Sequence, residues 1–252
     1  MVDLDILIWL ALAALVAGWV DAVAGGGGLL QVPALLLGLP GPGVQALGTN
    51  KVASVFGTAA ATGTYLRKVR PDMRAALPMT VLAFIGSLIG AATASSLPED
   101  VFRPVIIALL VAAWIWVAVS PAMGSQDRLR FAGRRHAVIA AAAGALIGFY
   151  DGLLGPGTGS FLLIVLVGLL GYSFLSASVT AKIVNLGTNV AAIIVFGLGG
   201  YIWWQVALVM AVFNVVGAVI GARMALRRGS GFVRVVFLVI VAVLIVRLIV
   251  SW

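Results

Sequence analysis

The sequence predicts an all-α, polytopic membrane protein made of two homologous halves, each with about five helical segments. Three observations predict this fold class. The first is composition: 63% of the 252 residues are hydrophobic and only 10% are charged, and the mean hydropathy is +1.19. Apolar stretches of this length are typical of membrane-spanning helices, which satisfy their own backbone polar groups inside lipid. The runs are too long and too uniformly apolar for the alternating strands of an outer-membrane barrel.

The second observation is an internal repeat. The sequence GWVDAVAGGGG, which begins at Gly18, returns as GFYDGLLGPGTG at Gly148. TNKVAS at Thr49 returns as TAKIVN at Thr180, and from there the register between the halves holds at 131 residues. In a chain this apolar, a duplicated unit predicts a secondary transporter whose site lies between the two repeats.

The third observation is the placement of positive charge. Twelve of the sixteen lysine and arginine residues fall in three clusters, at Arg67, Lys68, Arg70 and Arg74, at Arg128, Arg130, Arg134 and Arg135, and at Arg223, Arg227, Arg228 and Arg234. The positive-inside rule places all three clusters in the cytoplasm, and both termini then lie outside. Each half has an odd number of segments, so this parity favours inverted-topology repeats. A count of only eight spanning helices, four per half, would make the repeats parallel.

The segments follow in order from the apolar runs and the charged or glycine-rich breaks between them. The first half (residues 1–120) has segments at 5–24, 28–39, 48–66, 76–96 and 101–119. A basic cytoplasmic linker at 121–136 joins it to the second half (137–252), with segments at 137–154, 159–172, 180–198, 203–222 and 232–250. Segment 48–66 ends at the first basic cluster and therefore runs inward. Residues 1–47 then make an even number of crossings, either as two spans or as a hairpin that dips in from outside.

Glycine-rich turns precede the short second segment of each half. The segment at 28–39 is too short to cross about 30 Å of hydrocarbon, contains Pro33 and follows four consecutive glycines. The GPGTG run at Gly155 has the matching position in the second half. Such interrupted segments are the best sequence indicator of a transporter site, because their backbone N–H groups and helix ends bind anions. The alternative is a role in helix packing or as a flexible loop.

Four charged residues lie within the apolar segments as two equivalent pairs, Asp21 with Asp151 and Lys51 with Lys182. Charges inside lipid are costly, so they indicate function. The lysines are candidates for binding an anionic substrate. The aspartates are predicted mainly to brace the glycine turns through turn N–H groups, with proton coupling as a secondary role. The structural alternative is that Asp–Lys bridges pin the broken helices.

Uncharged groups near the lysines and glycines complete the predicted substrate site. Its members are Lys51, Lys182, Asn50, Thr49, Gly26, Gly27, Gly28, Gly157, Thr158, Gly159, Thr180 and Asn185. Ser54, Ser160 and Asn189 are further donors nearby. The sequence has no Ser-His-Asp set, metal-ligand spacing or redox motif, so we expect neither an enzyme nor a bound cofactor or metal.

The quoted motifs carry a family resemblance. DAVAGGGGLLQVPALL and ALGTNKVAS, with GFYDGLLGPGTGSFL and TAKIVNLGTN in the second half, resemble the sulfite exporter TauE/SafE family of bacterial inner-membrane proteins. The resemblance covers nearly the whole chain, and the lysines and glycine runs match the family's motifs. It implies transport of sulfite or an organosulfonate such as sulfoacetate across the cytoplasmic membrane, most simply as export. The halves differ at Gly26 and Pro156 and at Asn50 and Ala181, so the two sub-sites need not contribute equally.

Two rival functions remain open at this point. An anion channel would use the same donors without alternating access, and saturating flux with counterflow would exclude it. A non-transporting subunit of a membrane complex would have no need for paired charges inside the bilayer. The small anionic solute and the lipid bilayer are the expected partners, with no nucleic acid.

Overall fold

The computed structural model describes residues 3–94, 111, 114–115, 118–119 and 124–250. All regular elements in these ranges are helices, and the described residues contain no strand, so the all-α prediction is confirmed. Five of the described helices, α1, α4, α6, α8 and α9, are long and apolar enough to cross a membrane. Most of the predicted segment at 101–119 lies outside the described residues.

The helices follow the predicted order in both halves. The first half contains α1 (Leu4–Ala24), α2 (Gly28–Gly38), α3 (Gly43–Leu66) and α4 (Met73–Thr93). The second half contains α6 (Gly133–Leu153), α7 (Thr158–Ile164) with a π-helical continuation (Val165–Leu170), α8 (Phe174–Leu198) and α9 (Trp204–Val250). The repeat seen in the sequence therefore corresponds to a repeat of helices, with α1, α2, α3 and α4 matched by α6, α7, α8 and the first part of α9.

Several helix boundaries differ from the predicted ones. Both α3 and α8 begin about one and a half turns earlier than expected, because polar and small residues in their first turns masked the helical pattern. Ser173 caps α8, its Oγ accepting a hydrogen bond of 3.2 Å from the N–H of Ser176. Helix α6 begins at Gly133, inside the predicted linker. The last two predicted segments, at 203–222 and 232–250, are both helical within α9, and a break at Gly229, whose φ is 75°, separates them as expected.

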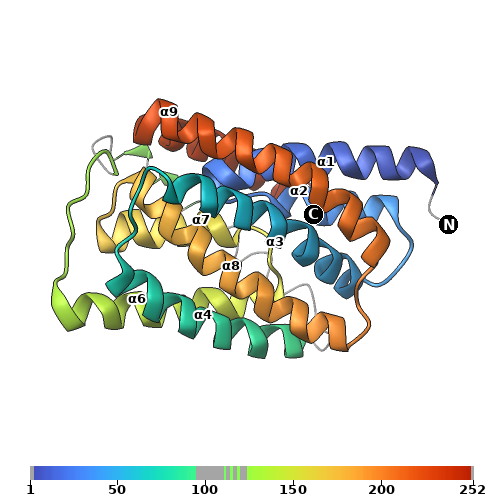
Figure 1. The fold of residues 1–252 in the computed structure, drawn as a ribbon, viewed down its shortest axis with the longest axis horizontal. Coiled ribbons are helices and arrows are strands. Elements are labelled where there is room, and N and C mark those ends of the chain that lie inside the picture. Colours follow the sequence, from blue (N-terminus) through green and yellow to red (C-terminus); the bar gives the residue numbers. More distant parts are fainter. Residues whose placement is uncertain (1–2, 95–110, 112–113, 116–117, 120–123, 251–252) are drawn as a thin grey trace.

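The helices form three layers (Figure 1). Helices α1 and α9 pack along one side, α4 and α6 along the other, and α3 and α8 lie between them. Each outer layer thus combines one helix from each half. If the two halves are exchanged, this pattern stays the same, because the packing of α1 on α9 is equivalent in the repeat to the packing of α6 on α4. Each half therefore contributes one helix to each of the three layers.

Glycines let the helices of the outer layers approach closely. Gly86 and Gly90 in α4, and Gly217 and Gly221 in α9, have the Gly-xxx-Gly spacing that favours such packing. A Cβ atom at Gly86 of α4 would meet the carbonyl oxygen of Ala145 in α6, and one at Gly217 of α9 would meet that of Leu15 in α1. Because these two glycines are equivalent in the repeat, the same close contact fixes both outer layers.

Helices α1 and α2 form a hairpin. Gly38, at the end of α2, lies against Ile6 and Leu10 near the start of α1, while Gly27 lies against Asp21 near its end. Helix α2 has 11 residues and extends about 16 Å, which is too short to cross a bilayer. Helix α1, in contrast, is long and apolar enough to cross a membrane.

The glycine turn of this hairpin meets the start of α7 from the other half. The N–H of Ser160 donates to the carbonyl oxygen of Gly25 at 3.1 Å, and the hydroxyl of Ser160 donates to that of Ala24 at 2.9 Å. Gly25 has a φ of 78°, and a Cβ atom there would overlap Gly159. The two breaks in the helices therefore contact each other directly at the centre of the protein.

The two central helices run in opposite directions. Gly48, near the start of α3, lies against Phe196 near the end of α8, and Tyr65, at the end of α3, lies beside Ser178 near the start of α8. Because α3 and α8 are equivalent in the repeat, their antiparallel packing is the relation that inverted-topology repeats require.

This geometry leads to a topology prediction for the protein in its membrane. A single cysteine at Gly200 is expected to react with an impermeant thiol reagent from outside, whereas cysteines at Arg130 and Lys68 react only after the membrane is permeabilised. The chain has no native cysteine to interfere. Labelling of Gly200 and Arg130 variants from the same side would contradict an inverted arrangement.

Candidate functional site

Two ion pairs join the halves crosswise. The Nζ atom of Lys51 in α3 lies 2.6 Å from Oδ2 of Asp151 in α6. The Nζ atom of Lys182 in α8 lies 2.7 Å from Oδ2 of Asp21 in α1. The sequence left Asp–Lys bridges open as an alternative, and the structure has them, each between a lysine of one half and an aspartate of the other.

The two pairs differ in burial. The side chains of Lys51 and Asp151 are each 2% exposed, whereas Asp21 retains 15% exposure beside Lys182 at 3%. Burying charges carries a large desolvation cost, which a partner at hydrogen-bonding distance offsets. Loss of either member would leave an uncompensated buried charge, so both pairs contribute to holding the halves together.

Asp151 also contacts the second glycine turn. Its Oδ1 atom accepts a hydrogen bond of 2.6 Å from the hydroxyl of Thr158, which lies 2.7 Å from the carbonyl oxygen of Gly155 as well. The hydroxyl of Tyr150 donates to the carbonyl oxygen of Pro156 in the same turn. The prediction that turn N–H groups hold the aspartates therefore differs from the contacts described, in which lysines and a threonine hydroxyl are the side-chain partners.

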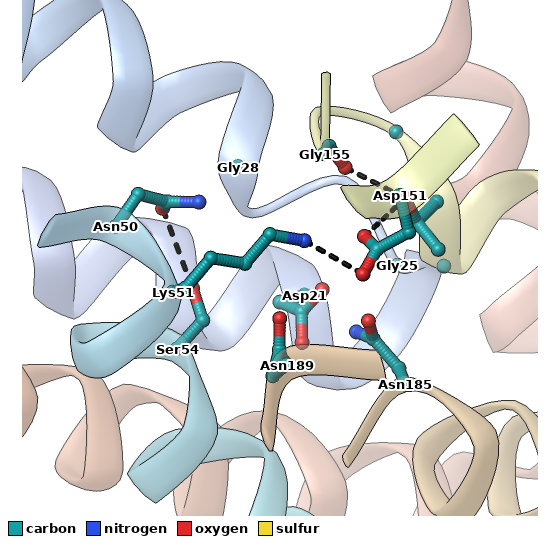
Figure 2. A pocket seen from close by; sticks show the side chains of 13 residues that line it. Asp21, Gly25, Gly28, Asn50, Lys51, Ser54, Asp151, Gly155, Asn185 and Asn189 are labelled. Carbon is teal, nitrogen blue, oxygen red and sulfur yellow. Dashed lines mark hydrogen bonds and ion pairs between the residues drawn. The ribbon is translucent and has the colours of Figure 1, made fainter. Parts of the chain in front are cut away.

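A cavity lies between the halves beside the Lys51–Asp151 pair (Figure 2). The cavity is narrow and open on one side, and its unfilled space, together with the solvent at its mouth, amounts to about 280 Å³. Figure 2 shows Lys51 reaching across to Asp151, with Asp21, Asn185 and Asn189 below the pair in this view. The lining residues are Asp21, Gly25, Gly28, Asn50, Lys51, Ser54, Asp151, Gly155, Gly157, Thr158, Gly159, Asn185 and Asn189.

Carboxamide groups supply the uncharged donors of this cavity. The side-chain oxygen of Asn50 accepts from Ser54 at 3.3 Å, and that of Asn185 accepts from Thr188 at 3.3 Å. The side-chain NH₂ group of each of these two residues is therefore left as a hydrogen-bond donor. The Nδ2 atom of Asn189 is buried and has no hydrogen-bond partner among the described residues. A buried donor without a partner costs free energy unless a ligand or water accepts from it.

Most of the predicted site residues come together here. Lys51, Asn50, Asn185, Gly28, Gly157, Thr158 and Gly159 all line the cavity, as do both aspartates. Lys182 instead lines an adjoining smaller cavity, which it shares with Asp21 and which is too narrow to hold a water molecule.

Besides Lys182, four predicted residues do not line the larger cavity. Gly26 and Gly27 belong to the first turn without facing the space. The hydroxyl of Thr49 accepts from the N–H of Trp203 at 3.0 Å, and that of Thr180 donates to the carbonyl oxygen of Ser176 at 3.2 Å. These hydroxyls have backbone partners and serve the packing of α3 and α8.

Two residues near the site were missed by the sequence reasoning. Gln31 is fully buried in α2, and its Nε2 atom lies 3.5 Å from the hydroxyl of Ser54. Its presence as the one polar residue in the run LLQVPALLL was a signal. Tyr150 adjoins Asp151 in the sequence, but nothing in the pattern predicted that its hydroxyl would bind the turn.

Comparison with known proteins gives a consistent result. The family described as sulfite exporter TauE/SafE matches residues 10–248. The probable membrane transporter protein ORF9 of Sinorhizobium sp. is 36% identical over 249 residues, covering 96% of this chain and 92% of its own length. A probable membrane transporter protein of Haemophilus influenzae is 34% identical, covering 92% and 90% respectively. The probable membrane transporter protein YfcA of Escherichia coli is also 34% identical, covering 93% and 86%.

Proposed function

Because the chain belongs to the sulfite exporter TauE/SafE family, we propose that it is a secondary transporter that moves a small sulfur-containing anion across the cytoplasmic membrane. The substrate class is sulfite or an organosulfonate such as sulfoacetate, and the direction is export. The relatives described as probable membrane transporter proteins support membrane transport as the general function.

One observation carries the proposal of an anion site. The cavity between the halves contains the ammonium group of Lys51 together with carboxamides from α3 and α8, and one of these donors, Asn189 Nδ2, has no partner. An ammonium and several N–H donors match the oxygen acceptors of a small oxyanion. The cavity also lies where transporter sites occur, at the interface of two repeats beside interrupted helices.

The arrangement suits alternating access. With the basic loops in the cytoplasm and both termini outside, the α1–α2 hairpin enters the membrane from one side and the α6–α7 hairpin enters it from the other. Their turns meet at Gly25 and Ser160, which closes the path between the two sides. Rocking of the outer layers against the central pair α3 and α8 would open the cavity to each side in turn.

The membrane potential supplies a driving force for export. With the cytoplasm negative, each unit of negative charge moved outward gains about 2.3 kcal/mol per 100 mV. Counterflow separates this carrier from a channel: in proteoliposomes, a saturating load of unlabelled sulfite inside is expected to accelerate entry of labelled sulfite. Flux that neither saturates nor shows counterflow would identify an anion channel.

The first test is a ligand screen with the purified protein. Sulfite, sulfate, thiosulfate, sulfoacetate and taurine are each added, and the thermal unfolding midpoint is followed. A ligand that binds the folded state raises the midpoint in proportion to the logarithm of its concentration. We expect a rise with sulfite or sulfoacetate, and absence of any rise across the panel would contradict the proposed function.

A variant of Asn189 tests the position of the site. Asn189→Leu is expected to weaken anion binding about tenfold or more, because hydrogen bonds to charged groups contribute about 1.5–3 kcal/mol. The substitution preserves approximate shape and leaves both ion pairs intact. Binding is measured by titration calorimetry on the detergent-purified protein.

Thr58→Val is the matched control. Thr58 occupies the position in α3 that Asn189 occupies in α8, and it is equally buried but does not line the cavity. We expect wild-type affinity for Thr58→Val. Equal weakening in both variants would mean that the effect comes from helix packing rather than from contact with the anion.

A further inference from the structure

The two crosswise ion pairs are equivalent in the repeat, yet their surroundings have diverged. The Lys51–Asp151 pair faces the larger cavity, with Asn50, Asn185 and Asn189 around it. The Lys182–Asp21 pair faces the smaller cavity, whose other lining residues are mostly small or apolar: Ala22, Val23, Gly25, Gly159, Leu163, Ser178 and Ala181. Asp21 lines both cavities, but Lys182 lines only the smaller one, so of the two lysines only Lys51 shares a cavity with the carboxamides that can take over as its partners.

The divergence is visible at two pairs of equivalent positions. Asn50 beside Lys51 is matched by Ala181 beside Lys182, and Asn189 is matched by Thr58. The two asparagines line the larger cavity, whereas Ala181 lines the smaller cavity without a polar group and Thr58 lines neither. The first pair is therefore placed to exchange its partner, whereas the second has no substitute for Asp21.

The charge balance limits how an anion can enter. Asp151 on α6 is faced by Lys51 from α3, by Asp21 from α1 and by the hydroxyl of Thr158 from α7, with Tyr150 next to it on its own helix. Lys182 on α8 neutralises Asp21. Two ammonium groups and two carboxylates cancel, so an added anion would leave an uncompensated negative charge in a buried, low-dielectric space.

We propose that the transported anion replaces Asp151 at Lys51, and that Asp151 takes up one proton as it releases the lysine. This inference rests on the proposed transport of an anion through the same site. The proton comes from water on the side to which the cavity is open and forms an O–H bond at Oδ2 of Asp151. Lys51 keeps its own proton throughout, and its ammonium passes from the carboxylate to the anion. For a monovalent anion the net charge of the site is then unchanged by binding, and for a divalent anion it changes by one unit instead of two.

The hydrogen bond from Thr158 gives Asp151 a fixed position during this exchange. It binds Oδ1, the carboxyl oxygen that does not contact Lys51. Protonation at Oδ2 can therefore proceed without loss of the contact that secures the second glycine turn. Asp21 remains an ionised partner of Lys182 and has no part in the proton uptake.

The experiment compares sulfite binding to wild type, Asp151→Asn and Asp21→Asn of the full chain. Titration calorimetry in buffers of different ionisation enthalpy counts the protons taken up with the anion. Sulfite itself titrates near neutral pH, but its contribution is the same for each protein and cancels in the difference. We expect wild type and Asp21→Asn to take up about one proton more than Asp151→Asn, as proton linkage requires.

Affinity gives a second readout. At pH 8, Asp151→Asn is expected to bind sulfite about tenfold or more tightly than wild type, because no carboxylate competes for Lys51 and no proton is needed. A merely structural role for Asp151 would weaken binding or leave it unchanged. Equal proton uptake by wild type and Asp151→Asn would overturn the inference, and so would loss of proton uptake in Asp21→Asn alone.

A measurement on wild type covers the case in which Asp151→Asn does not fold. Sulfoacetate keeps its charge above pH 6. If one proton is taken up with it, its affinity for wild type is expected to fall about tenfold for each unit by which the pH is raised. A pH-independent affinity would overturn the exchange while leaving the proposed function intact. Failure of both anions to bind wild type would instead refute the proposed function, and the exchange with it.

Discussion

Replacing Lys51 by methionine is expected to lower the free energy of unfolding by about 3–5 kcal/mol, because Asp151 is left as an unpaired buried carboxylate. Adding Asp151→Asn to this variant is expected to restore most of the loss, since the remaining amide carries no charge. Denaturant titration in detergent micelles measures both effects. The sequence predicted the lysines as candidates for binding the anion, and the crosswise pair adds a contribution of Lys51 to stability.

A crossed double variant provides the control. Lys51→Met with Asp21→Asn removes one positive and one negative charge, as the first double variant does, but leaves Asp151 and Lys182 both without partners. We expect it to be less stable than either single variant. Equal stability of the two double variants would mean that net charge, and not the specific pairing of Lys51 with Asp151, determines the free energy.

The second large effect is expected at the contact between the two glycine turns. Gly25→Ala places a Cβ atom 2.6 Å from the backbone nitrogen of Ser160 and against Gly159, in a residue whose φ of 78° is already unfavourable for alanine. The left-handed conformation costs about 1–2 kcal/mol and overpacking about 1–3 kcal/mol more. We expect a loss of about 2–5 kcal/mol in the free energy of unfolding, together with loss of transport, because the contact between the two turns is disrupted.

Gly200→Ala separates the two contributions. Gly200 has a φ of 73°, and a Cβ atom there would meet no other atom within 4 Å. Only the conformational cost applies, so a loss of about 1–2 kcal/mol with wild-type transport is expected. If Gly25→Ala is no more destabilising than Gly200→Ala, the turns do not press against each other in the way described.

The proton exchange proposed for Asp151 also bears on the energetics of export. A divalent anion that moves with one proton still carries one negative charge outward, which gains about 2.3 kcal/mol per 100 mV of membrane potential. Moving the proton outward costs about 1.4 kcal/mol per unit of pH gradient. Voltage therefore outweighs an ordinary pH gradient, and export of a dianion remains favourable. A monovalent anion with one proton would move without net charge and follow its own concentration gradient.

The sequence predicted the layout of the fold because composition, repeat and charge each act locally along the chain. The 131-residue register identified the equivalence of α3 and α8, and the glycine runs identified the breaks before α2 and α7. Helix starts were less predictable where side chains cap or pack the first turn, as Ser173 does in α8. The break between the last two segments was predicted from the charged and glycine-containing stretch between them, and it lies at Gly229.

The candidate site was predictable in its residues but not in its partnerships. Lys51, Lys182, Asp21 and Asp151 were conspicuous as charges in apolar segments. That each lysine pairs with the aspartate of the opposite half depends on how the halves interlock, which no local pattern encodes. The same holds for Thr49, whose hydroxyl lies against Trp203 rather than in the cavity. The difference between Asn50 and Ala181 in the sequence predicted that the two sub-sites are unequal. In the structure Asn50 lines the larger cavity and Ala181 lines the smaller one.

The crosswise pairing has a consequence for how the protein is made. Lys51 precedes its partner Asp151 by 100 residues, and Asp21 precedes Lys182 by 161 residues. At about 5–20 residues per second, ribosomes need about 5–20 s and about 8–32 s to bridge these intervals. During this time the newly inserted first half holds charges that cost roughly 2.5–3.5 kcal/mol each in the bilayer. A chain whose synthesis stops between residues 51 and 151 lacks both counter-charges, so it is the intermediate most exposed to expulsion from the membrane and to degradation.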